Sequence, residues 1–67
     1  VSVSLKIEYL EDPADLDSEI WHLWFRGDEA GALALARQRS GEALARGATA
    51  FRIVDFAGRE IALERIG

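Results

Sequence analysis

The sequence predicts a small α+β domain of order ββαββ, with an antiparallel sheet and one helix packed on one face. Residues 1–10 alternate between apolar and polar side chains, residues 28–46 carry a helical stripe, and residues 48–66 hold two short apolar runs around a turn. A period of two is typical of a half-buried strand, and a period of 3.6 is typical of a helix. With 67 residues, the chain 1–67 is expected to form one domain.

Residues 1–10 are expected to form the first strand, because their apolar side chains alternate without interruption. Its apolar face consists of Val1, Val3, Leu5, Ile7 and Tyr9. Successive side chains of a strand point to opposite faces, so the serines and charged residues between them would face away from the core.

The next segment, 20–25, holds both tryptophans and the only histidine. As a strand it places Trp21, Leu23 and Phe25 on one face and leaves the residues between them on the other. Aromatic and β-branched residues favour this interpretation. The alternative is a helix over residues 13–26, which gives the order βααββ, because Leu16, Ile20, Leu23 and Trp24 also recur at helical spacing.

Residues 28–46 are expected to form the helix, with Asp28 as N-cap and Gly47 at the left-handed position after its last turn. The expected buried stripe is Ala32, Leu33, Ala36, Ser40, Ala43 and Leu44, and Leu35 falls on the polar side. Glu42 and Arg46 form a favourable i,i+4 pair. Gly31 and Gly41 should each cost about 1 kcal/mol relative to alanine, so the helix depends on packing.

Residues 48–55 and 59–66 are expected to form a hairpin around the turn Asp55–Gly58. Phe51 and Ile53 would face inward from the first strand and Ile61 and Leu63 from the second. The helix, strand, Gly-Arg turn and closing strand resemble many small bacterial domains, and the pattern carries no motif specific to one family.

Several function classes lack the residues they require. The chain has no cysteine, which excludes disulfides and thiolate metal sites, and a lone histidine with scattered carboxylates is a poor set of zinc ligands. His22 has no nucleophile or acid at a known motif spacing, although a distant partner such as Asp55 stays open. No enzyme activity, cofactor or metal is therefore expected.

The charge is unevenly distributed along the chain. Residues 1–30 carry eight acids against Lys6 and Arg26, giving −6, and residues 31–67 carry four acids against six arginines, giving +2. An acidic protein repels phosphate backbones, so nucleic-acid binding is the third hypothesis. It would use Arg37, Arg39, Arg46, Arg52 and Arg59. The absence of cysteine, of a signal peptide and of a long apolar run leads us to expect a cytoplasmic protein without membrane contact.

The outward sheet face is the favoured candidate for function. It is expected to be an apolar, aromatic contact surface made of Ile20, His22, Trp24, Arg52, Val54 and Ile66. A chain this short buries little surface alone, so a non-catalytic module that forms a homodimer through this face is the first hypothesis. The second is an acidic inhibitor or antitoxin-like protein that binds a basic partner through Glu11, Asp12, Asp15, Asp17 and Glu19.

Overall fold

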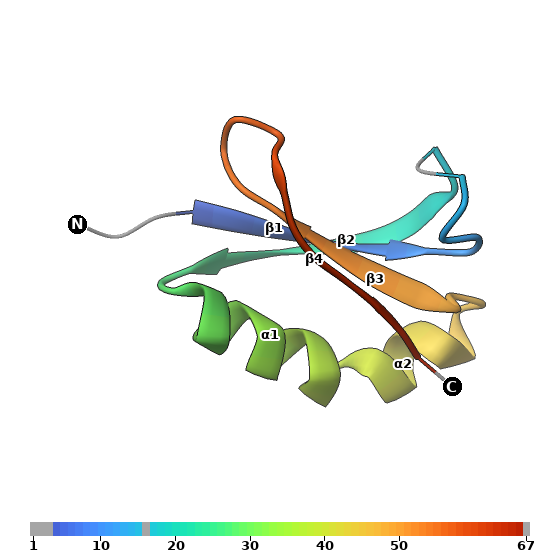
Figure 1. The fold of residues 1–67 in the computed structure, drawn as a ribbon. Coiled ribbons are helices and arrows are strands. Elements are labelled where there is room, and N and C mark those ends of the chain that lie inside the picture. Colours follow the sequence, from blue (N-terminus) through green and yellow to red (C-terminus); the bar gives the residue numbers. More distant parts are fainter. Residues whose placement is uncertain (1–3, 16, 67) are drawn as a thin grey trace.

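The computed structural model describes residues 4–15 and 17–66 and confirms the predicted α+β class (Figure 1). Its elements are β1 (Ser4–Leu10), β2 (Glu19–Arg26), α1 (Glu29–Gln38), α2 (Ser40–Ala45), β3 (Ala50–Val54) and β4 (Glu60–Arg65). Because β2 is a strand, the alternative with a helix over residues 13–26 is wrong. Val1, Val3 and Leu16 lie outside the described residues.

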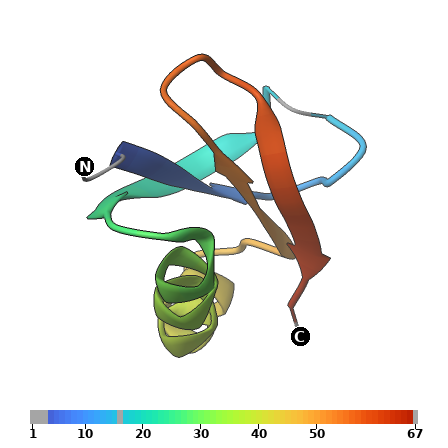
Figure 2. The same ribbon diagram turned by 60° about the vertical axis from the view of Figure 1, so that its left-hand side comes forward.

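The four strands form one antiparallel sheet in the order β2-β1-β3-β4. The hairpins β1–β2 and β3–β4 meet at their first strands, so β1 and β3 lie in the middle and β2 and β4 form the edges. Both helices lie on one side of this twisted sheet, which we call the inner face (Figure 2). The opposite side is the outer face.

The helical region is interrupted at Arg39, which corrects the prediction of a single helix. Arg39 has ψ near 1°, and the hydroxyl of Ser40 donates a 2.7 Å hydrogen bond to the carbonyl of Arg37. A serine hydroxyl that bonds to the backbone competes with a regular helix. The two ends are as predicted: Asp28 accepts a 2.8 Å bond from the amide of Gly31, and Gly47 has φ of 103°.

The helix layer touches the sheet through fully buried alanines, Ala32, Ala36 and Ala43. Because alanine is small, the helices approach closely, and leucines on both flanks of the stripe, Leu33 and Leu35, pack against the core. The prediction that Leu35 lies on the polar side is therefore wrong. Leu44, which was predicted to be inward, lies in α2, beyond the interruption at Arg39, and is 46% exposed.

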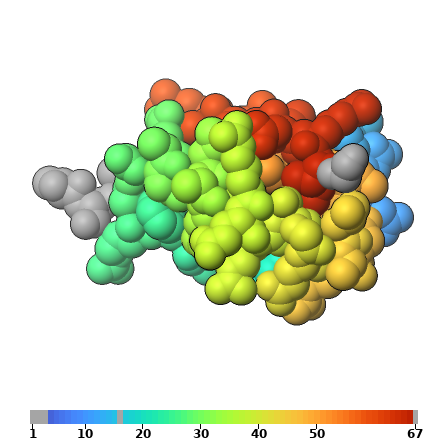
Figure 3. Space-filling model, turned by 90° about the horizontal axis from the view of Figure 1, so that it is seen from below, coloured from blue at the N-terminus to red at the C-terminus, as the bar shows by residue number. Residues whose placement is uncertain are grey.

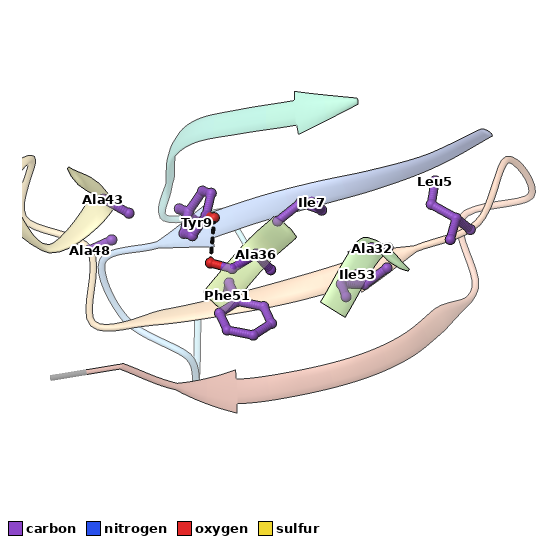
Figure 4. Close-up of a cluster of buried hydrophobic side chains, with 9 residues drawn as sticks. All are labelled: Leu5, Ile7, Tyr9, Ala32, Ala36, Ala43, Ala48, Phe51 and Ile53. Carbon is purple, nitrogen blue, oxygen red and sulfur yellow. Dashed lines mark hydrogen bonds between the residues drawn. The ribbon is translucent and has the colours of Figure 1, made fainter. Parts of the chain in front are cut away.

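The core lies between the helix layer and the central strands (Figure 4). Tyr9, Ile7, Phe51 and Ile53 are its large buried side chains. The ring of Tyr9 stacks on Trp21 at 5.1 Å and meets the edge of Phe51 at 6.0 Å. From the helix side, β4 stays visible next to α1 (Figure 3), so the single helix layer does not cover the full width of the sheet.

The last strand has a different register from the predicted one. A bulge between Val54↔Glu60 and Ile53↔Ala62 adds one residue to β4 and reverses the alternation after it. Leu63 therefore lies opposite Arg52 on the outer face and is 45% exposed, so its predicted inward position is wrong. Ile66 packs against the core instead of facing outward, which corrects its predicted position as well.

Tyr9 provides a test of the core. Its hydroxyl donates a 2.8 Å hydrogen bond to the carbonyl of Ala36, and burial raises its pKa from 10 to about 12. The folded state therefore holds the phenolic proton more tightly than the unfolded state. The contribution of this protonated hydroxyl to the free energy of unfolding is complete below about pH 10 and disappears as the pH rises through about 12.

We expect Tyr9→Phe to lose about 1 kcal/mol of unfolding free energy at neutral pH, because the hydrogen bond is removed. Above pH 10 the wild type should lose stability faster than the variant, so the difference between the two should shrink. Urea unfolding of both proteins across the alkaline range measures this. A difference that stays constant up to pH 12 would contradict the assignment.

Candidate functional site

The outer face is built mainly from polar side chains that the strand register brings together. Lys6 lies directly opposite Trp24 of β2 and Val54 of β3. Glu8 lies opposite His22 and Arg52 in the same way. Paired residues of antiparallel strands share a face, so these side chains are neighbours although they come from three different strands.

Ion pairs cross the outer face from one edge strand to the other. The network consists, in order, of His22, Glu19, Lys6, Glu8, Arg52 and Glu60. The Nζ atom of Lys6 lies 3.0 Å from a carboxylate oxygen of Glu19 and 3.1 Å from one of Glu8. Arg52 Nε lies 3.0 Å from Glu8 Oε1, and a longer contact of 4.0 Å leads on to Glu60.

The centre of this network is shielded from water. The side chain of Glu8 is 13% exposed and that of Arg52 is 16% exposed. Hydrogen bonds to Glu19 and Glu8 raise the pKa of Lys6. Burial opposes ionisation of Glu8, but the hydrogen bonds from Lys6 and Arg52 outweigh it and lower the pKa of Glu8 below its usual value. The centre of the outer face is thus charged and internally paired, which corrects the prediction of an apolar patch.

Trp24 is the main apolar group that the outer face presents to solvent. It is 64% exposed, which is unusual for a side chain of this size. The Nζ atom of Lys6 lies 5.9 Å from the centre of its ring, within cation–π range, and the ring of His22 meets it edge-on at 6.3 Å. Trp24 is therefore held by its neighbours but not covered by them.

The six residues predicted to form the contact surface do not lie together. His22, Trp24 and Arg52 share the outer face as predicted. Val54 points the same way but is only 5% exposed, so it offers almost no surface. The register shift at Tyr9/Leu10 makes Ile20 a bulged residue, and its Cδ1 atom lies 3.9 Å from where a Cβ atom would stand on Gly47, two residues after α2. Ile66 packs on the inner face.

Leu63 is the outer-face residue that the sequence analysis missed. It lies on β4, at the edge opposite to Trp24, and its position depends on the bulge in that strand. An Asp-Phe-Ala-Gly turn followed by alternation gives no sign of an extra residue. The alternation in residues 59–66 therefore predicted the wrong face for Leu63.

The five acidic residues predicted to bind a basic partner, which we call the acidic strip, partly stabilise the loop between β1 and β2. Asp12 Oδ1 accepts a bond from the amide of Ala14, and Asp15 Oδ1 accepts one from the amide of Asp17. Glu19 belongs to the ion-pair network, whereas Glu11 and Asp17 are exposed. Some carboxylates of this strip are therefore engaged in contacts within the protein, whereas others are exposed to solvent. Binding of a partner through them stays a prediction.

The arginines of the third hypothesis all lie close to a carboxylate. Arg37 makes a bidentate contact with Glu64 at 2.8 and 3.0 Å, and this contact raises the pKa of Arg37 and lowers that of Glu64. Arg39, Arg46, Arg52 and Arg59 lie within 4.0 Å of Glu42, Glu42, Glu8 and Asp55 respectively. They are spread over the helices, the outer face and the β3–β4 turn, so their charges do not form one basic surface.

His22 has Glu19 as its acidic neighbour, with 3.4 Å between His22 Nδ1 and Glu19 Oε2. The sequence left Asp55 open as a distant partner of His22. Asp55 instead accepts hydrogen bonds from the backbone amides of Ala57 and Arg59 in the β3–β4 turn.

Within residues 4–15 and 17–66, no group of three or more acidic or histidine side chains is placed to hold a metal. Over the same residues no helix is long and apolar enough to cross a membrane.

Comparison of the chain with family models, with curated proteins and with solved structures finds no match. The surface of this chain is therefore the basis for its proposed function.

Proposed function

We propose that this protein is a non-catalytic interaction module that forms a homodimer through β2, with Trp24 at the centre of the contact. The observation that carries the proposal is a tryptophan 64% exposed on an edge strand. Tryptophan is enriched among the residues that dominate binding energy in protein interfaces. An aromatic side chain buries about 150–250 Å² when it is fully covered. Covering the exposed part of Trp24 would therefore contribute about 3 kcal/mol per copy to the free energy of association.

The size of the chain supports the same proposal. A chain of about 60 residues buries only about 60% of its unfolded surface, and small domains commonly gain stability from oligomerisation. Here the inner side chains of β2, Trp21, Leu23 and Phe25, are only half-buried. A second copy placed along β2 would cover both these side chains and Trp24.

The surroundings of the polar side chains support a role without catalysis. The hydroxyls of Ser18, Ser40 and Thr49 donate to backbone carbonyls and so serve local structure. His22 contacts Glu19 and Trp24 on an open surface. A binding role uses the aromatic surface that is present, whereas nucleophilic catalysis would require a nucleophile next to His22.

Sedimentation velocity over a range of concentrations tests the proposal. We expect the wild type to be a dimer, and Trp24→Ala to weaken the dimer at least tenfold, since hot-spot residues, among which tryptophan is enriched, cost about 2 kcal/mol or more on truncation. Phe56→Ala is the matched control, because Phe56 is an 83% exposed aromatic residue outside β2. A wild type that is monomeric at high micromolar concentration, or a dimer indifferent to Trp24→Ala, would refute the proposal.

A further inference from the structure

We infer that two copies pair β2 with β2 in antiparallel orientation, about a two-fold axis at Leu23, to make one continuous eight-stranded sheet. The inference rests on the proposed function and specifies how the two copies meet. It depends on four features of β2: its unprotected edge, its exposure, its pattern of side chains and the charges at its ends.

The two edges of the sheet are protected to different degrees. β4 has three charged residues, Glu60, Glu64 and Arg65, and a bulge at its start. Charges and bulges are the devices by which edge strands avoid pairing with other chains. β2 also has a bulge, at Ile20, but its two charged residues, Glu19 and Arg26, lie at its ends, and the stretch 21–25 between them has no proline, lysine, arginine or acid and pairs regularly with β1. β2 is therefore the edge at which another strand can add.

The exposure of β2 also indicates that a neighbour is missing. None of its eight residues is buried, whereas four of the five residues of β3 are. α1 lies over β1 and β3 in the middle of the sheet. β2 therefore has one strand neighbour, and its apolar side chains are incompletely covered on both faces.

The side-chain pattern selects the register. In an antiparallel pair of identical strands, opposed residues must share a face, so a residue lies on the two-fold axis. An axis at Leu23 places His22 of one copy opposite Trp24 of the other, and Trp21 opposite Phe25. Aromatic pairs of this kind are stabilising across strands. An axis at His22 would oppose two imidazoles, and an axis at Trp24 would oppose His22 and Arg26.

The charges at the two ends of β2 favour a second copy as the partner. β2 begins with Glu19 and ends with Arg26, and the acidic residues Asp28 and Glu29 follow it in the chain. Antiparallel pairing about Leu23 places Arg26 of each copy next to Glu19 of the other, and this opposite-charge contact occurs twice in a symmetric dimer. A second copy thus offers β2 an opposite-charge contact as well as aromatic pairs.

A single introduced cysteine tests the register, because the wild-type sequence contains none. In a Leu23→Cys dimer the two Cα atoms would lie about 4.5–5.5 Å apart, within the range that a disulfide spans. Phe25→Cys is the comparison on the same strand and face, and because Phe25 belongs to the proposed contact, it is oxidised at a concentration where sedimentation shows that this variant is a dimer. Its two copies would be offset by four residues, about 14 Å along the strand, and could not be bridged. We expect mild oxidation to cross-link most of the Leu23→Cys protein and little of the Phe25→Cys protein.

Hydrogen exchange of the wild type provides a second test that needs no substitution. The amides in residues 21–25 that do not bond to β1 should exchange quickly in dilute protein and at least tenfold more slowly at concentrations where the dimer forms. Equal exchange at both concentrations would overturn the pairing.

The outcomes separate this inference from the proposed function. A dimer in sedimentation that links through residue 25 as well as through residue 23, or not at all, would overturn the pairing about Leu23 and leave the dimer standing. A protein that stays monomeric would overturn both.

Discussion

Phe51→Ala is expected to remove a large part of the free energy of unfolding of the protein at 25 °C. Phe51 is fully buried between the sheet and the helix layer, where its ring meets the edge of Tyr9. Replacing a buried phenylalanine by alanine typically costs 3–5 kcal/mol, because the transfer energy of the ring is lost and a cavity remains. A chain of 67 residues has a total stability of roughly 3–10 kcal/mol, so a single cavity can consume most of it.

Phe56→Ala is the matched control for this prediction. It makes the same chemical change five residues later, at a side chain that is 83% exposed in the β3–β4 turn. Its cost should stay within about 0.5 kcal/mol, as is usual for surface positions. Urea unfolding followed by circular dichroism measures both variants. If Phe51→Ala loses less than about 1.5 kcal/mol, Phe51 does not occupy the centre of the core.

Gly31→Ala should destabilise the protein although alanine is the better helix former. A Cβ atom at Gly31 would lie 2.6 Å from Cζ of Phe25 and 3.0 Å from Oδ1 of Asp28, the N-cap. The ring of Phe25 would have to move away from the core, and overpacking of this kind costs about 1–3 kcal/mol. This cost exceeds the gain of about 1 kcal/mol in helix propensity.

Gly41→Ala provides the opposite expectation in the same helix layer. No atom lies within 4 Å of a Cβ built at Gly41, so the substitution should stabilise the protein by up to about 1 kcal/mol. Thermal unfolding of the two alanine variants beside the wild type tests the pair. Equal shifts in the same direction would show that close packing against Phe25 does not determine the choice of glycine at residue 31.

The candidate site could be predicted only in part. The alternation in residues 20–25 correctly separated His22 and Trp24 from Trp21, Leu23 and Phe25. The same alternation could not show that Lys6, Glu8 and Arg52 would cover the middle of the outer face with ion pairs. These residues are 2 to 46 positions apart along the chain, and they meet because β1 lies between β2 and β3.

Bulges explain the errors at single residues. Ile20 and Leu63 both lie next to a register shift, and one extra residue in a strand exchanges its two faces. A bulge depends on the twist and on the fit to the neighbouring strand, which are properties of the assembled sheet. The interruption at Arg39 is similar, since neither proline nor glycine occupies that position.

The sequence by itself determined the α+β class, the helix cap at Asp28 and the glycine at the end of the helical region. These features depend on local periodicity and on backbone preferences, which a short stretch of residues contains in full. Only the tertiary structure decided which strands form the edges, which leucines are covered and what the outer face presents. Those outcomes depend on pairing between distant segments, and this pairing makes the segment around Trp24 an edge strand of the sheet.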